Sequence, residues 1–273
     1  MSKVAVIGIV GNSVFLPVEK FHVGGETIEA KSVTFELGGK GFNQAVAAKR
    51  WGAEVSFLAA AGEDGAENIE KFLHNEGINA AIVRKKESTA FAAIVTDNTG
   101  ANRVTVYQGA QLCAADVKER FETEIRTADV LLLNNEVAEE VNLAAAKIAE
   151  RYGVNIVLNP APQRETAKEL LNAVYLFTPN EHEAARLEEY QNVIQTLGGK
   201  GAYIRSENKI VPPEKVKAVD TTGAGDTFSG VLCAEIAGGA ALKEAVKAAV
   251  KASGKSVTKK GAVSSIPFKN EIN

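Results

Sequence analysis

The chain has few of the residues that mark disulfide scaffolds and metal centres. It contains two cysteines, Cys113 and Cys233, which lie far apart in the sequence and lack metal-ligand spacing. This pattern predicts reduced thiols and suits the cytoplasm. The three histidines (His22, His74 and His182) are scattered, which favours surface or structural roles over a metal site.

An excess of basic charge and long apolar runs are also absent. The net charge of −3 gives no basic footprint for nucleic acid. No apolar run reaches the roughly 18 residues of a membrane span, and the first residues lack the apolar core of a signal peptide. We therefore expect a cytoplasmic protein whose partners are neither nucleic acid nor membrane.

What is present is the composition of an ordinary globular protein. Hydrophobic residues make up 45% of the 273 residues, enough for one large α/β domain and short for two. Short apolar runs alternate with amphipathic stretches, which predicts a parallel sheet with helices on both sides. The expected strands are Val4–Gly8, Val55–Ala60, Val130–Leu133, Val154–Leu158, Val174–Phe177 and Val193–Leu197. The expected helical faces are Ile69–Leu73, Val117–Phe121–Ile125 and Val141–Ala145–Ile148, the last ending at Gly153.

Two regions break this alternation. Residues 13–37 form extended segments around a Gly24-Gly25 turn, and residues 90–108 form a hairpin around Asp97–Gly100. Taken alone, these segments predict extra edge strands.

The run Asp220–Thr227 (DTTGAGDT) is the most informative segment. Gly223 and Gly225 allow a close approach of the backbone to a ligand, and the helix predicted over Phe228–Ala237 directs its positive end to the same place. A carboxylate beside such an anion site suits phosphoryl transfer, with Asp226 taking a proton from the attacking hydroxyl. An N-cap followed by a glycine turn would account for the same residues.

A second run, Gly38–Ala45 (GGKGFNQA), follows a strand-like stretch over Ser32–Leu37 and opens a helix that stops near Gly52. Neither the Walker pattern GxxxxGK[ST] nor GxGxxG is present. Together the two runs resemble the paired signatures of the ribokinase-like (PfkB-type) carbohydrate kinases. The resemblance covers nearly the whole chain, through Asn159–Pro162, Thr178–Glu181, Thr196–Gly201 and Lys259–Ala262.

This resemblance implies a ribokinase-like three-layer α/β/α domain over residues 1–273, with a mostly parallel central sheet and a small β-sheet lid. The lid strands come from about residues 13–37 and 90–108, and they exclude water from the reaction. The implied activity is transfer of the γ-phosphoryl of ATP to a primary hydroxyl of a small sugar, with Mg²⁺ and in many members K⁺. Some members dimerise through the lid, so we expect a homodimer.

The resemblance also assigns residues to the reacting groups. Asp226 becomes the catalytic base, and Gly223, Ala224 and Gly225 supply N–H groups to the transferred phosphoryl. The sugar contacts are Gly11, Ser13, Gly39, Lys40, Asn43, Glu136 and Asp226. Asn180, Glu183, Thr196, Gly198 and Gly201 line the Mg²⁺–ATP side. The K⁺ site takes Asp220, Thr222, Ser256, Lys259, Gly261 and Ser265, mostly through backbone carbonyls.

Two departures from the family pattern affect these expectations. Ribokinases carry an Asn after the first strand and an Asp two residues later, where this chain has Gly11 and Ser13 with Asn12 between them. Losing that carboxylate makes ribose doubtful as the substrate. Only Ala184–Gln195 separate the N-x-x-E and T-L-G motifs, so we expect one outer helix to be missing.

Two other functions stay open. A nucleoside kinase of the same fold would use apolar lid residues for the base, and Phe15, Phe35 and Phe91 are candidates. The shortened nucleotide-side segment leaves room for a non-catalytic sugar- or nucleotide-binding homologue, against which the intact Asp226 motif argues.

Overall fold

The protein is described here by a computed structural model covering residues 2–99 and 101–272. Its centre is a parallel sheet of order β10-β9-β8-β1-β4-β5. The strands are β1 (Lys3–Ile7), β4 (Glu54–Gly62), β5 (Asn79–Lys85), β8 (Val130–Asn134), β9 (Asn155–Asn159) and β10 (Leu176–Phe177). The predicted parallel sheet is therefore confirmed, except that the expected strand Val193–Leu197 lies in a separate antiparallel sheet. Strand β5 was not predicted, because its apolar residues are only partly buried at the sheet edge.

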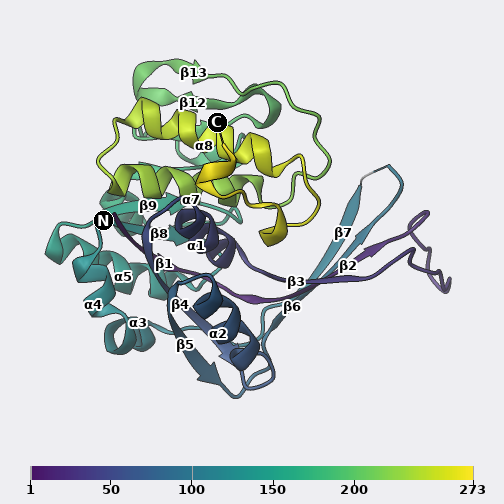
Figure 1. The fold of residues 1–273 in the computed structure, drawn as a ribbon. Helices are drawn as coiled ribbons and strands as arrows, with labels where there is room; N and C mark the ends of the chain where they lie inside the picture. The colour runs from purple at the N-terminus through teal and green to yellow at the C-terminus, as the bar shows by residue number, and fades with distance from the viewer. Residues whose placement is uncertain (1, 100, 273) are drawn as a thin grey trace.

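Helices cover both faces of this sheet (Figure 1). Alternate residues of β1 enter different cores: Val4 and Val6 pack in one, and Ala5 and Ile7 in the other. The first core includes α1 (Lys40–Arg50), α2 (Ala66–Asn75), α7 (Ala224–Ala237) and α8 (Leu242–Ser256). The second includes α3 (Ala114–Arg120), α4 (Glu122–Thr127), α5 (Glu139–Tyr152) and α6 (Lys168–Ala173).

One expected helix is divided in two. The face Val117–Phe121–Ile125 is buried as predicted, but Phe121 has φ −141°, outside the helical region, and separates α3 from α4. The predicted end of α5 is confirmed, since Gly153 adopts the left-handed conformation with φ 69°.

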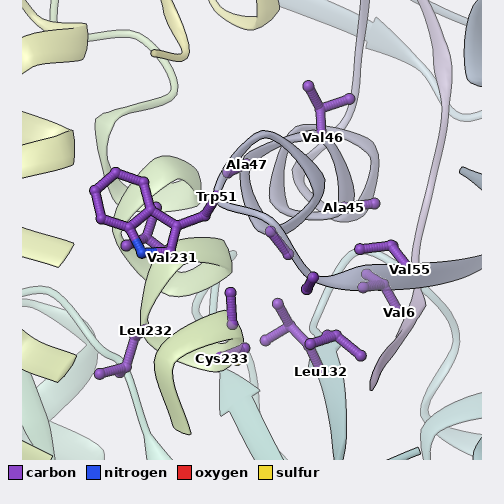
Figure 2. Packing of buried hydrophobic residues seen from close by; sticks show 14 of the residues in the cluster. Val6, Ala45, Val46, Ala47, Trp51, Val55, Leu132, Val231, Leu232 and Cys233 are labelled. Carbon is purple, nitrogen blue, oxygen red and sulfur yellow. The ribbon is translucent and has the colours of Figure 1, made fainter. Parts of the chain in front are cut away.

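Helices α1 and α7 approach each other closely above the sheet, where Ala47 of α1 and Val231 of α7 lie in the same core (Figure 2). A Cβ atom on Gly230 would lie 2.3 Å from the carbonyl oxygen of Gln44, so the contact requires glycine at this position. Because α1 and α7 carry the two motif runs, this packing brings the runs together.

Four strands form a second sheet that projects from the α/β body (Figure 1). They are β2 (Gly11–Pro17), β3 (Thr34–Gly38), β6 (Ala90–Thr96) and β7 (Asn102–Tyr107), in the order β3-β2-β6-β7. Only the β2–β6 pair among them is parallel. We call this sheet the lid. Its strands lie where the two extended regions predicted them, and Gly100 of the hairpin turn lies outside the described residues.

A third, antiparallel sheet contains β11 (Ile194–Thr196), β12 (Ala202–Ile204) and β13 (Lys209–Val211). Parallel bridges from Phe177 to Val193 and from Asn180 to Thr196 join it to the central sheet beyond β10. Within the described chain, the segment between Glu183 and Ile194 holds one 3-10 turn, η1 (Glu183–Arg186), and no α-helix. This agrees with the missing helix inferred from the short segment. Four further 3-10 turns are η2 (Gly198–Lys200), η3 (Arg205–Glu207), η4 (Val263–Ser265) and η5 (Lys269–Glu271).

Candidate active site

A cavity of about 680 Å³ lies between the lid and the carboxyl ends of β1 and β8. The order of the sheet reverses between these strands, the place where open α/β sheets bind ligands. Five predicted sugar contacts line the cavity: Gly11, Ser13, Gly39, Lys40 and Glu136. Asn43 and Asp226 are buried beneath it and are not part of its lining.

The turn before α1 places Lys40. Gly39 has φ 112°, and a Cβ atom there would lie 2.3 Å from the carbonyl oxygen of Ile9, so only glycine fits. The Lys40 backbone N–H then donates to Glu136 Oε2 at 2.7 Å. Glu136 comes from the loop after β8, and burial raises the pKa of its carboxyl group to about 7.

Asp226 lies in the first turn of α7 and is 7% exposed. Its carboxylate accepts hydrogen bonds from Asn43 Nδ2 at 3.0 Å and from Gln44 Nε2 at 3.2 Å. Burial raises the pKa of Asp226, although Lys40 and the two amides act in the opposite direction. Two amide oxygens next to it, Asn43 Oδ1 and Gln44 Oε1, are buried and have no hydrogen-bond partner among the described residues. These oxygens can accept hydrogen bonds from a ligand hydroxyl.

The turn before Asp226 has the geometry of an anion site. Gly223 is left-handed, with φ 73°, and precedes Ala224, the first residue of α7. A Cβ atom on Gly225 would meet no atom within 4 Å, so this glycine faces open space. The Ala224 N–H donates to the carbonyl of Thr221 at 3.3 Å, so the anion site depends on the N–H groups that follow it in the first turn of α7.

Lys40 connects the two sides of the site electrostatically. Asp226 is the main cause that raises the pKa of its ammonium group; burial opposes the shift, and Glu136 and Glu183 add to it. One cation is therefore close to the carboxylates of both the sugar side and the nucleotide side.

On the nucleotide side, Asn180 forms a closed pair with Glu183, the first residue of η1. The Asn180 backbone N–H and Nδ2 donate to the two Glu183 oxygens at 2.9 and 2.8 Å, and the Glu183 N–H donates to Asn180 Oδ1 at 2.9 Å. No group of three or more His, Cys, Asp or Glu residues in the described chain could hold a metal. A single buried carboxylate that already accepts two hydrogen bonds fits a Mg²⁺ role through water.

The loop at Thr196–Gly201 lies next to this pair. The Thr196 N–H donates to the carbonyl of Pro179 at 2.8 Å, and the Leu197 N–H donates to the carbonyl of Gly201 at 2.8 Å. Gly198 and Gly201 both have positive φ, 53° and 94°. The structure thus brings Thr196, Gly198 and Gly201 into one turn beside Asn180 and Glu183.

The two halves of the predicted cation site also meet. Asp220 Oδ2 accepts the Gly261 N–H at 3.0 Å, while Oδ1 accepts the Thr222 N–H and hydroxyl at 3.0 and 2.7 Å. Burial opposes the effect of these bonds, which lower the pKa of Asp220. A carboxylate beside a carbonyl-rich loop fits a K⁺ ion.

The other predicted cation-site side chains bond elsewhere. Ser256 and Ser265 donate to carbonyls of their own turns, and the Lys259 ammonium lies 3.4 Å from Glu271. A cation would therefore meet this half of the site mainly through carbonyl oxygens.

Sequence reasoning did not assign roles to three polar residues of the site. Gln44 stands within the GGKGFNQA run and bonds Asp226, and Asn12 lines the cavity next to Ser13. Arg164 also lines the cavity, and its Nε and Nη2 atoms are buried without a hydrogen-bond partner among the described residues. The signal for Arg164 was its place two residues after the Asn159–Pro162 motif.

These features define a phosphotransferase with an α/β body and a lid, and comparisons with known proteins agree. The pattern of the pfkB family carbohydrate kinases matches residues 1–269. The ribokinase of Schizosaccharomyces pombe is 36% identical over 311 residues, covering 100% of this chain and 97% of the relative. The ribokinase structure from Thermotoga maritima has a TM-score of 0.89 at 31% identity, covering 99% of this chain and 98% of that one. Arabidopsis thaliana ribokinase, solved with ribose and ATP, has a TM-score of 0.84 at 25% identity, covering 99% and 97%.

The chain belongs to the pfkB family of carbohydrate kinases. It is a ribokinase-like, ATP-dependent sugar kinase. No helix in the described part of the chain is long and apolar enough to cross a membrane.

Proposed function

We propose that Asp226 is the general base for phosphorylation of a primary sugar hydroxyl. The observation that carries this role is its buried carboxylate at the start of α7, between the Asn43 and Gln44 amides and next to the Gly223–Gly225 turn. The hydroxyl proton passes to the carboxylate while the sugar oxygen forms a bond to the γ-phosphorus. The bond between the γ-phosphorus and the bridging oxygen breaks, and ADP leaves.

The anion site and Lys40 stabilise the charge that develops during this transfer. The N–H group of Gly225 and the positive end of α7 stabilise the phosphoryl oxygens. The Ala224 N–H donates to the carbonyl of Thr221 at 3.3 Å and would have to exchange that partner to take part. Lys40 neutralises charge between the two substrates, in agreement with its electrostatic contact with Asp226 and Glu183. Bound Mg²⁺, which Glu183 and Asn180 would hold through water, screens the ATP phosphates. A K⁺ ion at Asp220 and the 259–265 loop would support the same turn.

We further propose that ribose is not the preferred sugar. Ser13 lines the cavity where a ribose-specific site needs a carboxylate, and Asn12 beside it offers only an amide. A sugar hydroxyl left without a buried partner costs about 1–3 kcal/mol. The Nε and Nη2 atoms of Arg164, which have no partner among the described residues, give the cavity donors, so sugars with an acidic group belong in the substrate screen together with neutral pentoses and hexoses.

A nucleoside kinase is the second candidate, and Phe91 favours it. Phe91 lines the cavity, which is large for a single pentose, and an aromatic ring can stack on a base. The other two aromatic residues considered for base stacking do not support a nucleoside site. Phe15 is not in the cavity lining, and Phe35 is 71% exposed.

The assembly and location are proposals as well. We propose one kinase domain over residues 1–273, a homodimer formed through the lid, and a cytoplasmic location. Phe35, Val104, Val106 and Tyr107 on β3 and β7 are more than half exposed, which supports a lid interface. Light scattering of the purified chain distinguishes a dimer from a monomer.

The test of the function is ADP release with Mg²⁺–ATP and a panel of neutral sugars, sugar acids and nucleosides. We expect at least one sugar to accelerate ADP release above the rate with water alone. Faster release with nucleosides than with any sugar would support the second candidate. No acceleration by any compound, in folded protein that binds ATP, would refute the proposal.

A further inference from the structure

Glu36 joins the lid to a loop behind the anion site. It lies on β3, opposite Ser13 of β2 and two residues before Gly38, where the sugar-binding turn begins. Its Oε2 accepts the Ala262 backbone N–H at 3.0 Å, and its Oε1 accepts the Ser264 hydroxyl at 2.6 Å. A Cβ atom on Gly261 would lie 2.3 Å from Oε1, so the carboxylate sits directly against this loop.

The loop contacted by Glu36 packs against the anion site. A Cβ atom on Gly223 would lie 3.4 Å from Ala262 Cα, and the neighbouring Gly261 N–H bonds to Asp220. Residues 261–264 therefore contact both Asp220 and Gly223 in the turn before α7.

A second side chain fixes the loop from the opposite direction. Arg50, the last residue of α1, donates to the carbonyls of Val263 and Ile266 at 2.9 and 2.8 Å. Its guanidinium is held in turn by Glu76, at 2.5 and 3.1 Å. Because Arg50 anchors the loop to the body, Glu36 is the contact through which a movement of β3 reaches it.

We propose that Glu36 is a positioning residue that couples sugar binding under the lid to the alignment of the anion site at residues 223–225. Glu36 is not part of the cavity lining. When bound sugar draws the lid strands toward the body, β3 is held in one position. The Glu36 carboxylate then holds residues 262–264 in place behind Gly223. This inference rests on the proposed role of the 223–225 turn in phosphoryl transfer.

The kinetic test compares two reactions of the same protein: ATP hydrolysis without sugar, and ADP release with the best sugar of the panel. For Glu36→Ala, we expect the acceleration by sugar to fall about 2- to 30-fold, the range of coupling carried by residues between two sites. Sugar-independent hydrolysis and the KM for sugar should stay within about twofold of wild type, as for couplings that leave each site intact. Glu36→Gln keeps one acceptor oxygen and should restore most of the acceleration. An equal loss in both reactions would mean that Glu36 only supports the loop, and would overturn the proposal.

The matched control is Glu29→Ala, because Glu29 is an exposed carboxylate in the segment between β2 and β3. It should behave as wild type in both reactions. Ser264→Ala removes one of the two bonds and should give a smaller loss than Glu36→Ala, without adding to it in the double variant.

Amide hydrogen exchange tests the coupling without any sugar, so it remains informative if the panel contains no substrate and the proposed function fails. In Glu36→Ala, we expect faster exchange of residues 261–266 and also of residues 223–227, where the Thr227 N–H bonds to the carbonyl of Gly223. Glu36→Gln and Glu29→Ala should match wild type at both segments. Faster exchange confined to residues 261–266 would show that the effect stops at the loop, and would refute the proposal.

Discussion

The centre of the site and its lid are built on different physical principles. Asp226, Asn43 and Gln44 come from α1 and α7, whose backbones touch at Gly230, and all three side chains are buried. Most residues of β6 are partly or fully exposed, and every residue of β7 is exposed. Close-packed helices hold reacting groups within a narrow range of positions, whereas an exposed sheet can change its side chains at little cost in stability. We infer that the centre fixes the reaction and the lid selects the sugar.

The largest effect is expected at the centre. Asp226→Asn keeps the shape of the side chain but cannot take the hydroxyl proton, so kcat should fall on the order of 10²–10⁴-fold. Circular dichroism and ATP binding should show an intact fold, and a variant with a near-wild-type rate would remove Asp226 from the reaction. The same change at Asp97, a half-buried residue in the turn after β6, should leave kcat unaltered.

Glu136 should show the cost of burying a carboxylate at the centre. Its pKa is about 7 in the folded protein and near 4.5 when unfolded, so between these pH values the folded chain holds one more proton. Stability from this group is then complete below about pH 4.5 and is lost as the pH rises to about 7. Glu136→Gln should raise the free energy of unfolding at pH 8 by about 1–3 kcal/mol more than at pH 4.5.

Urea unfolding of the Glu136→Gln variant at the two pH values measures this difference. Glu140→Gln is the control, because Glu140 is exposed on the neighbouring helix α5. A Glu136→Gln effect that does not change with pH would show that the folded pKa lies near the unfolded one.

The lid should respond in sugar preference and not in the rate of chemistry. Ser13→Asp places a carboxylate in the cavity and should improve the kcat/KM for ribose by about one to two decades, since each hydroxyl that gains a buried partner contributes about 1–3 kcal/mol. Wild-type protein that already prefers ribose across the panel, or a Ser13→Asp variant no better than wild type, would contradict the proposed division between centre and lid. The Asn12→Asp variant tests whether the loop is shifted by one residue, so that position 12 and not position 13 meets the sugar.

The sequence predicted the centre better than its surroundings for a physical reason. The DTTGAGDT and GGKGFNQA runs combine glycine conformations, helix starts and reactive side chains within a few residues, so local pattern was sufficient to propose Asp226, Lys40 and Asn43 as site residues. The parallel order of the sheet followed from apolar runs that are buried on both faces, such as β1 and β8.

The contacts that escaped prediction join distant parts of the chain. Nothing near Gln44 in the sequence indicates its bond to Asp226, and nothing near Glu36 indicates the loop at Ala262. The division of the α3–α4 stretch at Phe121 depends on one backbone angle that leaves the apolar spacing unchanged. Strands β12 and β13 have three residues each, too few for a periodic pattern to show.

The smallest predicted effect lies on the nucleotide side, outside both the centre and the lid. Glu183→Gln removes the charge that would orient Mg²⁺-bound water and leaves one of the two Asn180 donors without an acceptor. We expect the Mg²⁺ concentration for half-maximal rate to rise about 10-fold, the lower end for outer-sphere partners of a metal. The KM for sugar should change little, because Glu183 is not part of the cavity lining. The measurement is a Mg²⁺ titration at saturating ATP and sugar, with Glu181→Gln on the exposed side of the same turn as the control. An unchanged titration would exclude Glu183 from Mg²⁺ placement, and an equal rise in the KM for sugar would show that the nucleotide side and the centre do not act separately.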